Sequence, residues 1–94
     1  MKYFIYILYA RSVDKFYVGE SPDVAQRLSL HENHHFKRAF TKIADDWEIK
    51  LEFQCQNRED ALFLEKFIKR MKSKKFIQKI IQNPDILTQI LTKK

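Results

Sequence analysis

The sequence predicts an α+β fold in which helices flank one small three-stranded sheet. Three observations support this prediction. Residues 3–10 form a nearly continuous apolar run, residues 47–54 alternate strictly between apolar and polar, and helical periodicity with recognisable caps begins at residue 57. The elements follow in the order β-β-α-β-α-α, with one more short helix at the end, which is typical of the α+β class. At 94 residues, the whole chain (1–94) is expected to form a single domain with one modest core.

The first two strands are expected to form a hairpin. Tyr3–Ala10 is apolar on both alternating faces, which is typical of a central strand covered on both sides. A polar turn, Ser12–Lys15, separates it from a second short apolar run, Phe16–Gly19. The first run follows Lys2 and superficially resembles a signal peptide, but it is short, rich in tyrosine and without a small-residue cleavage site.

Gly19 is the only glycine in the sequence and lies just before a predicted helix start. Glycine tolerates positive φ and close backbone approach, so we expect a tight corner where a side chain cannot be placed. The helix should follow over Pro22 to about Glu32, with Ser21 as its N-cap. A strand, a corner and a helix N-terminus in this order suit an anionic ligand such as phosphate.

The middle of the chain is expected to hold a surface loop and then the third strand. Residues 33–46 are polar and basic, without clear periodicity. Apolar and polar residues then alternate without exception over Trp47–Gln54, which predicts a half-buried strand. The side chains expected on its inner face are Trp47, Ile49, Leu51 and Phe53.

The last part of the chain is predicted to be helical. The three expected helices are Arg58 to about Lys72, Lys74–Ile81 and Pro84–Leu91. Asn57, Ser73 and Asn83–Asp85 precede them and are the expected N-caps. The buried stripe of the first of these helices is expected to be Ala61, Leu64, Ile68 and Met71, widened by Phe63 and Phe67.

The composition indicates a folded, basic protein. Hydrophobic residues make up 45% of the chain and aromatic residues 14%, which is enough for a packed core and argues against disorder. The net charge of +6 favours a polyanionic partner, with nucleic acid first and an anionic membrane surface second. Cys55 is the single cysteine, which fits a reducing, cytoplasmic location. No segment approaches the length of about 20 apolar residues that a membrane-spanning helix needs.

Five polar side chains are candidates for a catalytic site. Tyr6 and Tyr17 lie on the two strands that the turn should pair, and Arg27 and His31 lie one turn apart on one helix face. Glu65 lies on a helix that is apolar on one side and basic on the other. Phosphodiester cleavage needs a group that activates the nucleophile, a cation for the developing charge and usually a metal. Arginine matches two phosphate oxygens, and Mg²⁺ is often held by only one or two carboxylates.

This ordered set of residues resembles the GIY-YIG nuclease superfamily. The residues that carry the resemblance are Phe4-Ile5-Tyr6, Tyr17-Val18-Gly19, Arg27-Leu28, His31 and Glu65, within about residues 2–80. They are similar to the small stand-alone members, related to the N-terminal nuclease domain of the excision-repair endonuclease. The resemblance implies a central three-stranded antiparallel sheet flanked by helices and DNA as the substrate.

The resemblance also implies a role for each residue. Tyr6 contacts or deprotonates the attacking water, Tyr17 lies at the scissile phosphate, and Arg27 stabilises that phosphate. His31 assists proton transfer, and Glu65 binds a single divalent metal, Mg²⁺ or Mn²⁺. We expect Tyr6 rather than Tyr17 to be the general base, because the central strand holds it rigidly.

A basic run beside Glu65 is predicted to contact DNA. The run consists of Lys66, Lys69, Arg70, Lys72, Lys74 and Lys75. Such residues bind the phosphate backbone and position a duplex without reading its sequence. An ordinary solvated helix face is the alternative, and an ion pair of Glu65 with Lys69 is the plain alternative to metal binding. Glu20 departs from the expected pattern, because it places a negative charge beside the predicted phosphate site.

The sequence therefore favours a metal-dependent endonuclease that hydrolyses DNA, with a role in repair or processing. A non-catalytic nucleic-acid-binding module with the same fold is the alternative, and a structural domain would leave the polar set unexplained. A zinc site is also conceivable, because His31, His34 and His35 have the spacing of a helix face. Zinc needs three or four ligands, however, and Cys55 is the only soft ligand available.

Overall fold

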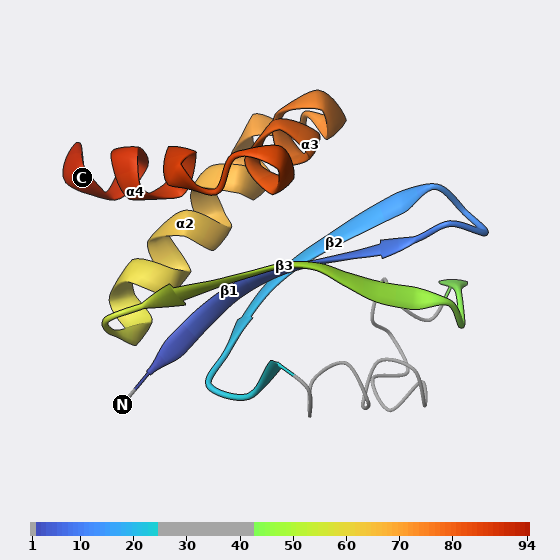
Figure 1. The fold of residues 1–94 in the computed structure, drawn as a ribbon, viewed down its shortest axis with the longest axis horizontal. Helices are drawn as coiled ribbons and strands as arrows, with labels where there is room; N and C mark the ends of the chain where they lie inside the picture. Colours follow the sequence, from blue (N-terminus) through green and yellow to red (C-terminus); the bar gives the residue numbers. More distant parts are fainter. Residues whose placement is uncertain (1, 25–42) are drawn as a thin grey trace.

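The computed structural model describes residues 2–24 and 43–94, and its strands form one antiparallel sheet (Figure 1). The strands are β1 (Tyr3–Ala10), β2 (Lys15–Ser21) and β3 (Trp47–Cys55), and the helices are α2 (Arg58–Met71), α3 (Lys74–Gln82) and α4 (Asp85–Thr92). The strand order is β2-β1-β3, so β1 is central. The predicted α+β class and antiparallel sheet are confirmed. The predicted helix that begins at Pro22 lies almost wholly outside the described residues.

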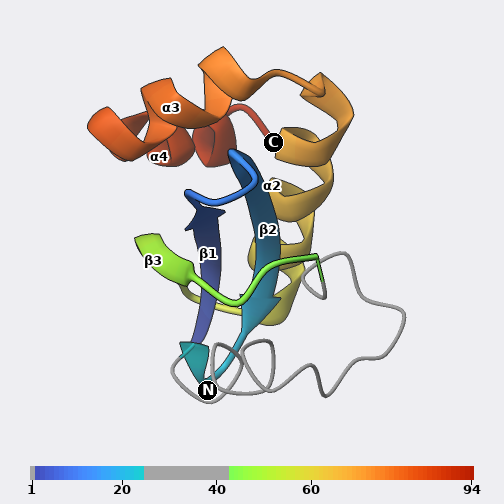
Figure 2. The same cartoon turned by 90° about the vertical axis from the view of Figure 1, so that its right-hand side faces the viewer.

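The three described helices cover one face of the sheet. In Figure 1 they lie on one side of the strands, and Figure 2 shows α2 running alongside the sheet with α3 and α4 across one end. The buried side chains between helices and sheet include Ile5, Ile7, Val18 and Leu51 from the strands and Leu64, Ile68, Ile80 and Leu87 from the helices. Burying this apolar surface holds the helices on the sheet.

The opposite face of β1 is covered as well. Tyr6, Leu8 and Ala10 are fully buried there and pack with Val24, Ala44 and Trp47. A strand that is buried on both faces has no position for a polar residue in its centre, which explains its continuous apolar sequence. The predicted central strand is confirmed.

β3 contains a β-bulge that divides its apolar side chains between the two faces of the sheet. Consecutive residues 7 and 8 of β1 pair with residues 51 and 49 of β3, so Lys50 is an extra residue. Trp47 and Ile49 therefore pack on the face opposite the helices, whereas Leu51 and Phe53 pack beneath the helices. The prediction that all four share one face was wrong, because alternation in the sequence does not show where a strand gains a residue.

The predicted caps of α2 and α3 are confirmed. The Asn57 side chain accepts a hydrogen bond from the backbone N–H of Asp60 at 2.8 Å. The Ser73 hydroxyl accepts one from the backbone N–H of Phe76 at 3.1 Å. Each cap satisfies one of the N–H groups that a first helical turn leaves without a partner.

Two details of the predicted helices were wrong. Asn83 ends α3, since its backbone N–H bonds to the carbonyl of Lys79, and α4 begins after Pro84 without a side-chain cap. Met71, predicted to be buried, is 48% exposed. α2 ends at this residue, and the chain turns away at Lys72, whose φ is 49°.

Two carboxylates tie the turn between β1 and β2 to the rest of the structure. Asp14 accepts hydrogen bonds from the Lys74 ammonium at 2.7 Å and from the Tyr9 hydroxyl at 2.5 Å. Asp46 accepts one from the Ser12 hydroxyl at 2.6 Å and one from its backbone N–H at 2.8 Å. These hydrogen bonds favour the charged carboxylates and hold the pKa of both aspartates below the ordinary value of 3.8.

The lowered pKa of Asp14 predicts that its contribution to stability depends on pH. The charged form stabilises the fold at neutral pH, and this stabilisation is lost as the pH falls below 3.8 through the folded-state pKa. Asp14→Asn should therefore lower the Tm at neutral pH, and the difference from wild type should shrink in acid. Thermal unfolding followed by circular dichroism across this range tests it, with Glu52→Gln, an exposed carboxylate on β3, as control. A Tm difference that is independent of pH would contradict the prediction.

Candidate active site

Tyr6 and Tyr17 lie on the same face of the sheet. Tyr6 pairs with Gly19 and Leu8 pairs with Tyr17, so the two tyrosines occupy diagonal positions on neighbouring strands. Their ring centroids are 6.2 Å apart. The Tyr6 side chain is fully buried, and that of Tyr17 is half-buried. The hairpin thus brings the two predicted tyrosines together on the face opposite the helices.

Gly19 lies inside β2 and not at a corner. The strand continues to Ser21, and the φ of Gly19 is not positive. A Cβ at this position would lie 2.5 Å from the hydroxyl oxygen of Tyr6 and 2.6 Å from Cζ of its ring. The predicted corner was wrong, but the expectation that no side chain fits here is confirmed. The glycine leaves the space in which the Tyr6 ring lies against β2.

The start of the helix after β2 is described only in part. The Ser21 hydroxyl accepts a hydrogen bond from the backbone N–H of Asp23 at 3.0 Å, as expected of an N-cap. The predicted site residues Arg27 and His31 lie outside the described residues, as do His34 and His35 of the conceivable zinc site.

Glu65 lies on the side of α2 that borders β2. Its side chain is 20% exposed, and its Oε1 lies 3.7 Å from the ammonium of Lys69, one turn later. That ammonium lies 5.7 Å from the centre of the Tyr17 ring, within cation–π range. The ion pair expected from the spacing is therefore present, and Lys69 links Glu65 to Tyr17. The sequence predicted only a DNA-backbone role for Lys69 and gave no sign of this link, because a contact between a helix and a strand leaves no periodic signal.

Glu20 faces away from the two tyrosines. It pairs with Ile5, which packs beneath the helices, so its side chain lies on the opposite face of the sheet from Tyr6. Its Oε1 lies 4.0 Å from Nε of Arg58, and its Oε2 is buried without a hydrogen-bond partner among the described residues. The expectation that Glu20 adds its charge beside the tyrosines was wrong, because strand alternation turns it to the other face.

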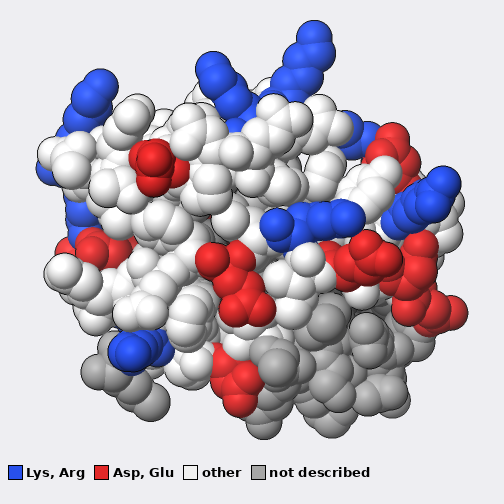
Figure 3. All heavy atoms as spheres, in the orientation of Figure 1, with Lys and Arg blue, Asp and Glu red and all other residues white. Residues whose placement is uncertain are grey.

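The six residues of the predicted basic run surround the corner between α2 and α3, and all are exposed: Lys66, Lys69, Arg70, Lys72, Lys74 and Lys75. Lys74 is paired with Asp14 at 2.7 Å, and Arg70 lies over the Phe67 ring. On the face seen in Figure 3, basic side chains project from the upper rim and carboxylates are scattered across the middle. Positive charge is thus concentrated at the helical edge and is not spread over that face.

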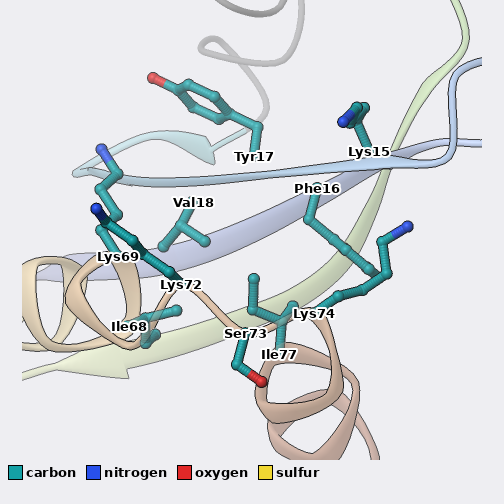
Figure 4. Close-up of a pocket in the computed structure, with 10 residues that line it drawn as sticks. All are labelled: Lys15, Phe16, Tyr17, Val18, Ile68, Lys69, Lys72, Ser73, Lys74 and Ile77. Atoms are coloured by element: carbon teal, nitrogen blue, oxygen red, sulfur yellow. The ribbon is translucent and has the colours of Figure 1, made fainter.

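A pocket of about 400 Å³ opens between β2 and the corner of α2 and α3 (Figure 4). Four apolar side chains line it: Phe16, Val18, Ile68 and Ile77. Its other lining residues are Lys15, Tyr17, Lys69, Lys72, Ser73 and Lys74. Figure 4 shows Phe16 and Val18 pointing from β2 toward the helices, whereas the Tyr17 ring points to the other side of the strand. The pocket and the tyrosine pair therefore lie on opposite faces of the same edge strand.

A family model described as the GIY-YIG catalytic domain matches residues 2–79 of the chain. The chain belongs to this family. No curated protein and no solved structure gives a match. GIY-YIG domains are nuclease domains, so the chain has the fold of a nuclease. The match covers the sheet, α2 and most of α3, which are the elements that carry Tyr6, Tyr17 and Glu65.

GIY-YIG nucleases typically use a divalent metal, and Glu65 is compatible with this use. Among the described residues, no three His, Cys, Asp or Glu side chains come together in a way that could hold a metal ion. One carboxylate suffices for Mg²⁺ when water and a substrate phosphate supply the other ligands. Cys55 is unsuited, because burial beneath the helices raises the pKa of its thiol and disfavours the metal-binding thiolate. No helix in residues 2–24 or 43–94 is long and apolar enough to span a bilayer.

The contact between Gly19 and Tyr6 predicts that Gly19→Ala destabilises the protein. The new methyl group would meet the Tyr6 ring, which is fully buried and has little space to move. We expect a loss on the order of 1–3 kcal/mol in the free energy of unfolding, as is usual for overpacking, measured by urea denaturation. Glu52→Ala is the matched control, because Glu52 is the partner of Tyr6 on β3 and is exposed. Wild-type stability of Gly19→Ala would rule out the close contact.

Proposed function

We propose that this protein is a metal-dependent endonuclease that hydrolyses DNA phosphodiester bonds, with a role in DNA repair or processing. Its nearest functional parallel would be the N-terminal nuclease domain of the excision-repair endonuclease. One observation carries the proposal beyond family membership: Tyr6, Tyr17 and Glu65 converge on the edge strand β2, joined through Lys69. These groups come from three separate elements, and packing of a core does not require them to meet.

Tyr6 is the proposed general base. Its ring is fully buried and contacts Gly19, so its hydroxyl has one fixed position relative to β2. A positioned base contributes a factor of about 100 to 10,000 to the rate. Tyr17 is half-buried and lies beside the Lys69 ammonium, and its proposed role is to orient the water and the scissile phosphate.

Glu65 is the proposed ligand of one divalent metal, Mg²⁺ or Mn²⁺. Such an ion, when bound, would stabilise negative charge on the phosphate oxygens. Because Glu65 is partly exposed at the border of α2 and β2, a phosphate that approaches Tyr17 also approaches its carboxylate. Lys69 neutralises this carboxylate in the free protein and would contact the substrate phosphate.

Arg27 and His31 are proposed to complete the site from the residues that the structure does not describe. Arg27 would stabilise the charge that develops on the phosphate, since a guanidinium donates two parallel hydrogen bonds to phosphate oxygens. His31 would assist proton transfer. The exposed run from Lys66 to Lys75 would hold the DNA backbone, so affinity for duplex DNA should fall with added salt.

Glu65→Gln should abolish cleavage and leave the fold intact. The change keeps the shape of the side chain and removes the charge that the metal requires. Cleavage of duplex, nicked and flapped DNA in Mg²⁺ or Mn²⁺ is the measurement, with circular dichroism and DNA binding in EDTA as checks on the fold. Glu52→Gln is the matched control and should cleave normally. Full metal-dependent activity of Glu65→Gln would remove Glu65 from the site. Wild-type protein that binds DNA and cleaves none of it would establish the non-catalytic alternative.

Tyr6→Phe should slow cleavage by a factor on the order of 100 or more, as expected when a general base is lost. Tyr17→Phe should cost less, because orienting a water contributes less than accepting its proton. Single-turnover rates across pH separate the two roles, since only loss of the base should also change the pH profile. Tyr9→Phe serves as control, because Tyr9 bonds to Asp14 in the hairpin turn. A near-normal rate and profile for Tyr6→Phe would transfer the role of base to Tyr17.

A further inference from the structure

The pocket between β2 and the corner of α2 and α3 has an apolar interior and a basic rim. Val18 and Ile68 are buried in its floor, and Phe16 and Ile77 are half-buried in its walls. Its volume of about 400 Å³ is within the range of about 300–1,000 Å³ that is typical of ligand sites. The pocket exists because the chain turns away at Lys72, which separates α3 from β2 at this point.

The charges around the pocket favour an anionic ligand with an apolar part. Four lysines line it, and none of the described residues that line it is acidic. Lys74 is bound to Asp14 at 2.7 Å and Lys69 lies 3.7 Å from Glu65. Lys15 and Lys72 have no ion-pair partner in the described part of the chain, so their ammonium groups are available to a ligand.

The pocket adjoins the proposed catalytic site across β2. Tyr17 lines the pocket through its place in the strand, while its ring points to the other side (Figure 4). The Lys69 and Lys72 side chains both extend from the pocket toward the side on which this ring lies (Figure 4). A nucleic acid strand crossing the edge of β2 could therefore place one phosphate beside Tyr17 and the neighbouring nucleotide at the pocket.

We infer that this pocket binds the base of an unpaired nucleotide next to the scissile phosphate, so that the protein prefers DNA in which a single-stranded flank adjoins a duplex. Bases stack on aromatic side chains without regard to sequence, and Phe16 provides such a surface between aliphatic walls. Lys15 and Lys72 would contact the flanking phosphates. A base within a duplex is held in its stack and reaches such a pocket only after extrusion. This inference rests on the proposed function for the position of the scissile phosphate.

Binding without catalysis tests the inference directly. Fluorescence anisotropy in EDTA compares a blunt duplex, the same duplex with a single-stranded flank, and a third DNA whose flank lacks the base nearest the junction. The wild-type protein should bind the flanked duplex on the order of 5- to 100-fold more tightly than the other two, the range expected for one stacked base. Equal affinity for the flanked and the abasic DNA would overturn the inference, and this comparison needs no variant.

Variants then locate the effect in the pocket. Phe16→Leu should remove most of the preference for the flanked duplex and keep binding to the blunt duplex, whereas Phe63→Leu, a half-buried aromatic away from the pocket, should keep both. Lys72→Ala should weaken binding to the flanked duplex more than Lys79→Ala, an exposed lysine on α3. Equal losses on both DNAs for Phe16→Leu would overturn the assignment. So would a dimer in sedimentation that Phe16→Leu dissociates, since the pocket would then hold a second copy of the chain.

Cleavage assays separate this inference from the proposed function. Equal cleavage and equal binding of blunt and flanked DNA would leave the nuclease assignment standing and overturn the pocket assignment. A preference for the flanked DNA in EDTA without cleavage in Mg²⁺ or Mn²⁺ would support the pocket and overturn the nuclease assignment.

Discussion

The burial of β1 on both faces is the constraint on which the rest of the structure depends. Eight residues with almost no polar side chain are shielded from water only if cover is provided on each side. The helices supply it on one face, and Trp47 with its neighbours supplies it on the other. The bulge at Lys50 is part of this solution, because it allows β3 to contribute apolar side chains to both faces.

The same constraint determines how the candidate site is built. Tyr6 projects from the centre of β1 and must lie over one of the neighbouring strands, and Gly19 on β2 leaves the space for its ring. Because Tyr17 is diagonal to Tyr6, the hairpin register alone brings the two rings to 6.2 Å. Helix α2 adds Glu65 by packing its apolar stripe beneath the sheet, which leaves its adjacent polar stripe at the edge of β2.

The distribution of charge follows from the position of β2 as an edge strand. On the helix side of this edge, Glu20 faces Arg58 near one end of α2, and lysines gather near the other. On the opposite face lie the tyrosines, to which Lys69 reaches around the edge. An anionic polymer that follows the edge would meet positive charge at the corner of α2 and α3, beside the tyrosines and the apolar pocket.

The sequence by itself determined the strands, the caps Asn57 and Ser73, and three residues of the candidate site, because these depend on local hydrogen bonds, periodicity and motif spacing. Arg27 and His31 stay sequence-based predictions. Tertiary structure alone decided the bulge at Lys50, the reason for Gly19, the face of Glu20 and the pocket. Each of these arises where residues distant in the chain meet, and neither propensity nor spacing records which side chain will occupy a neighbour's space.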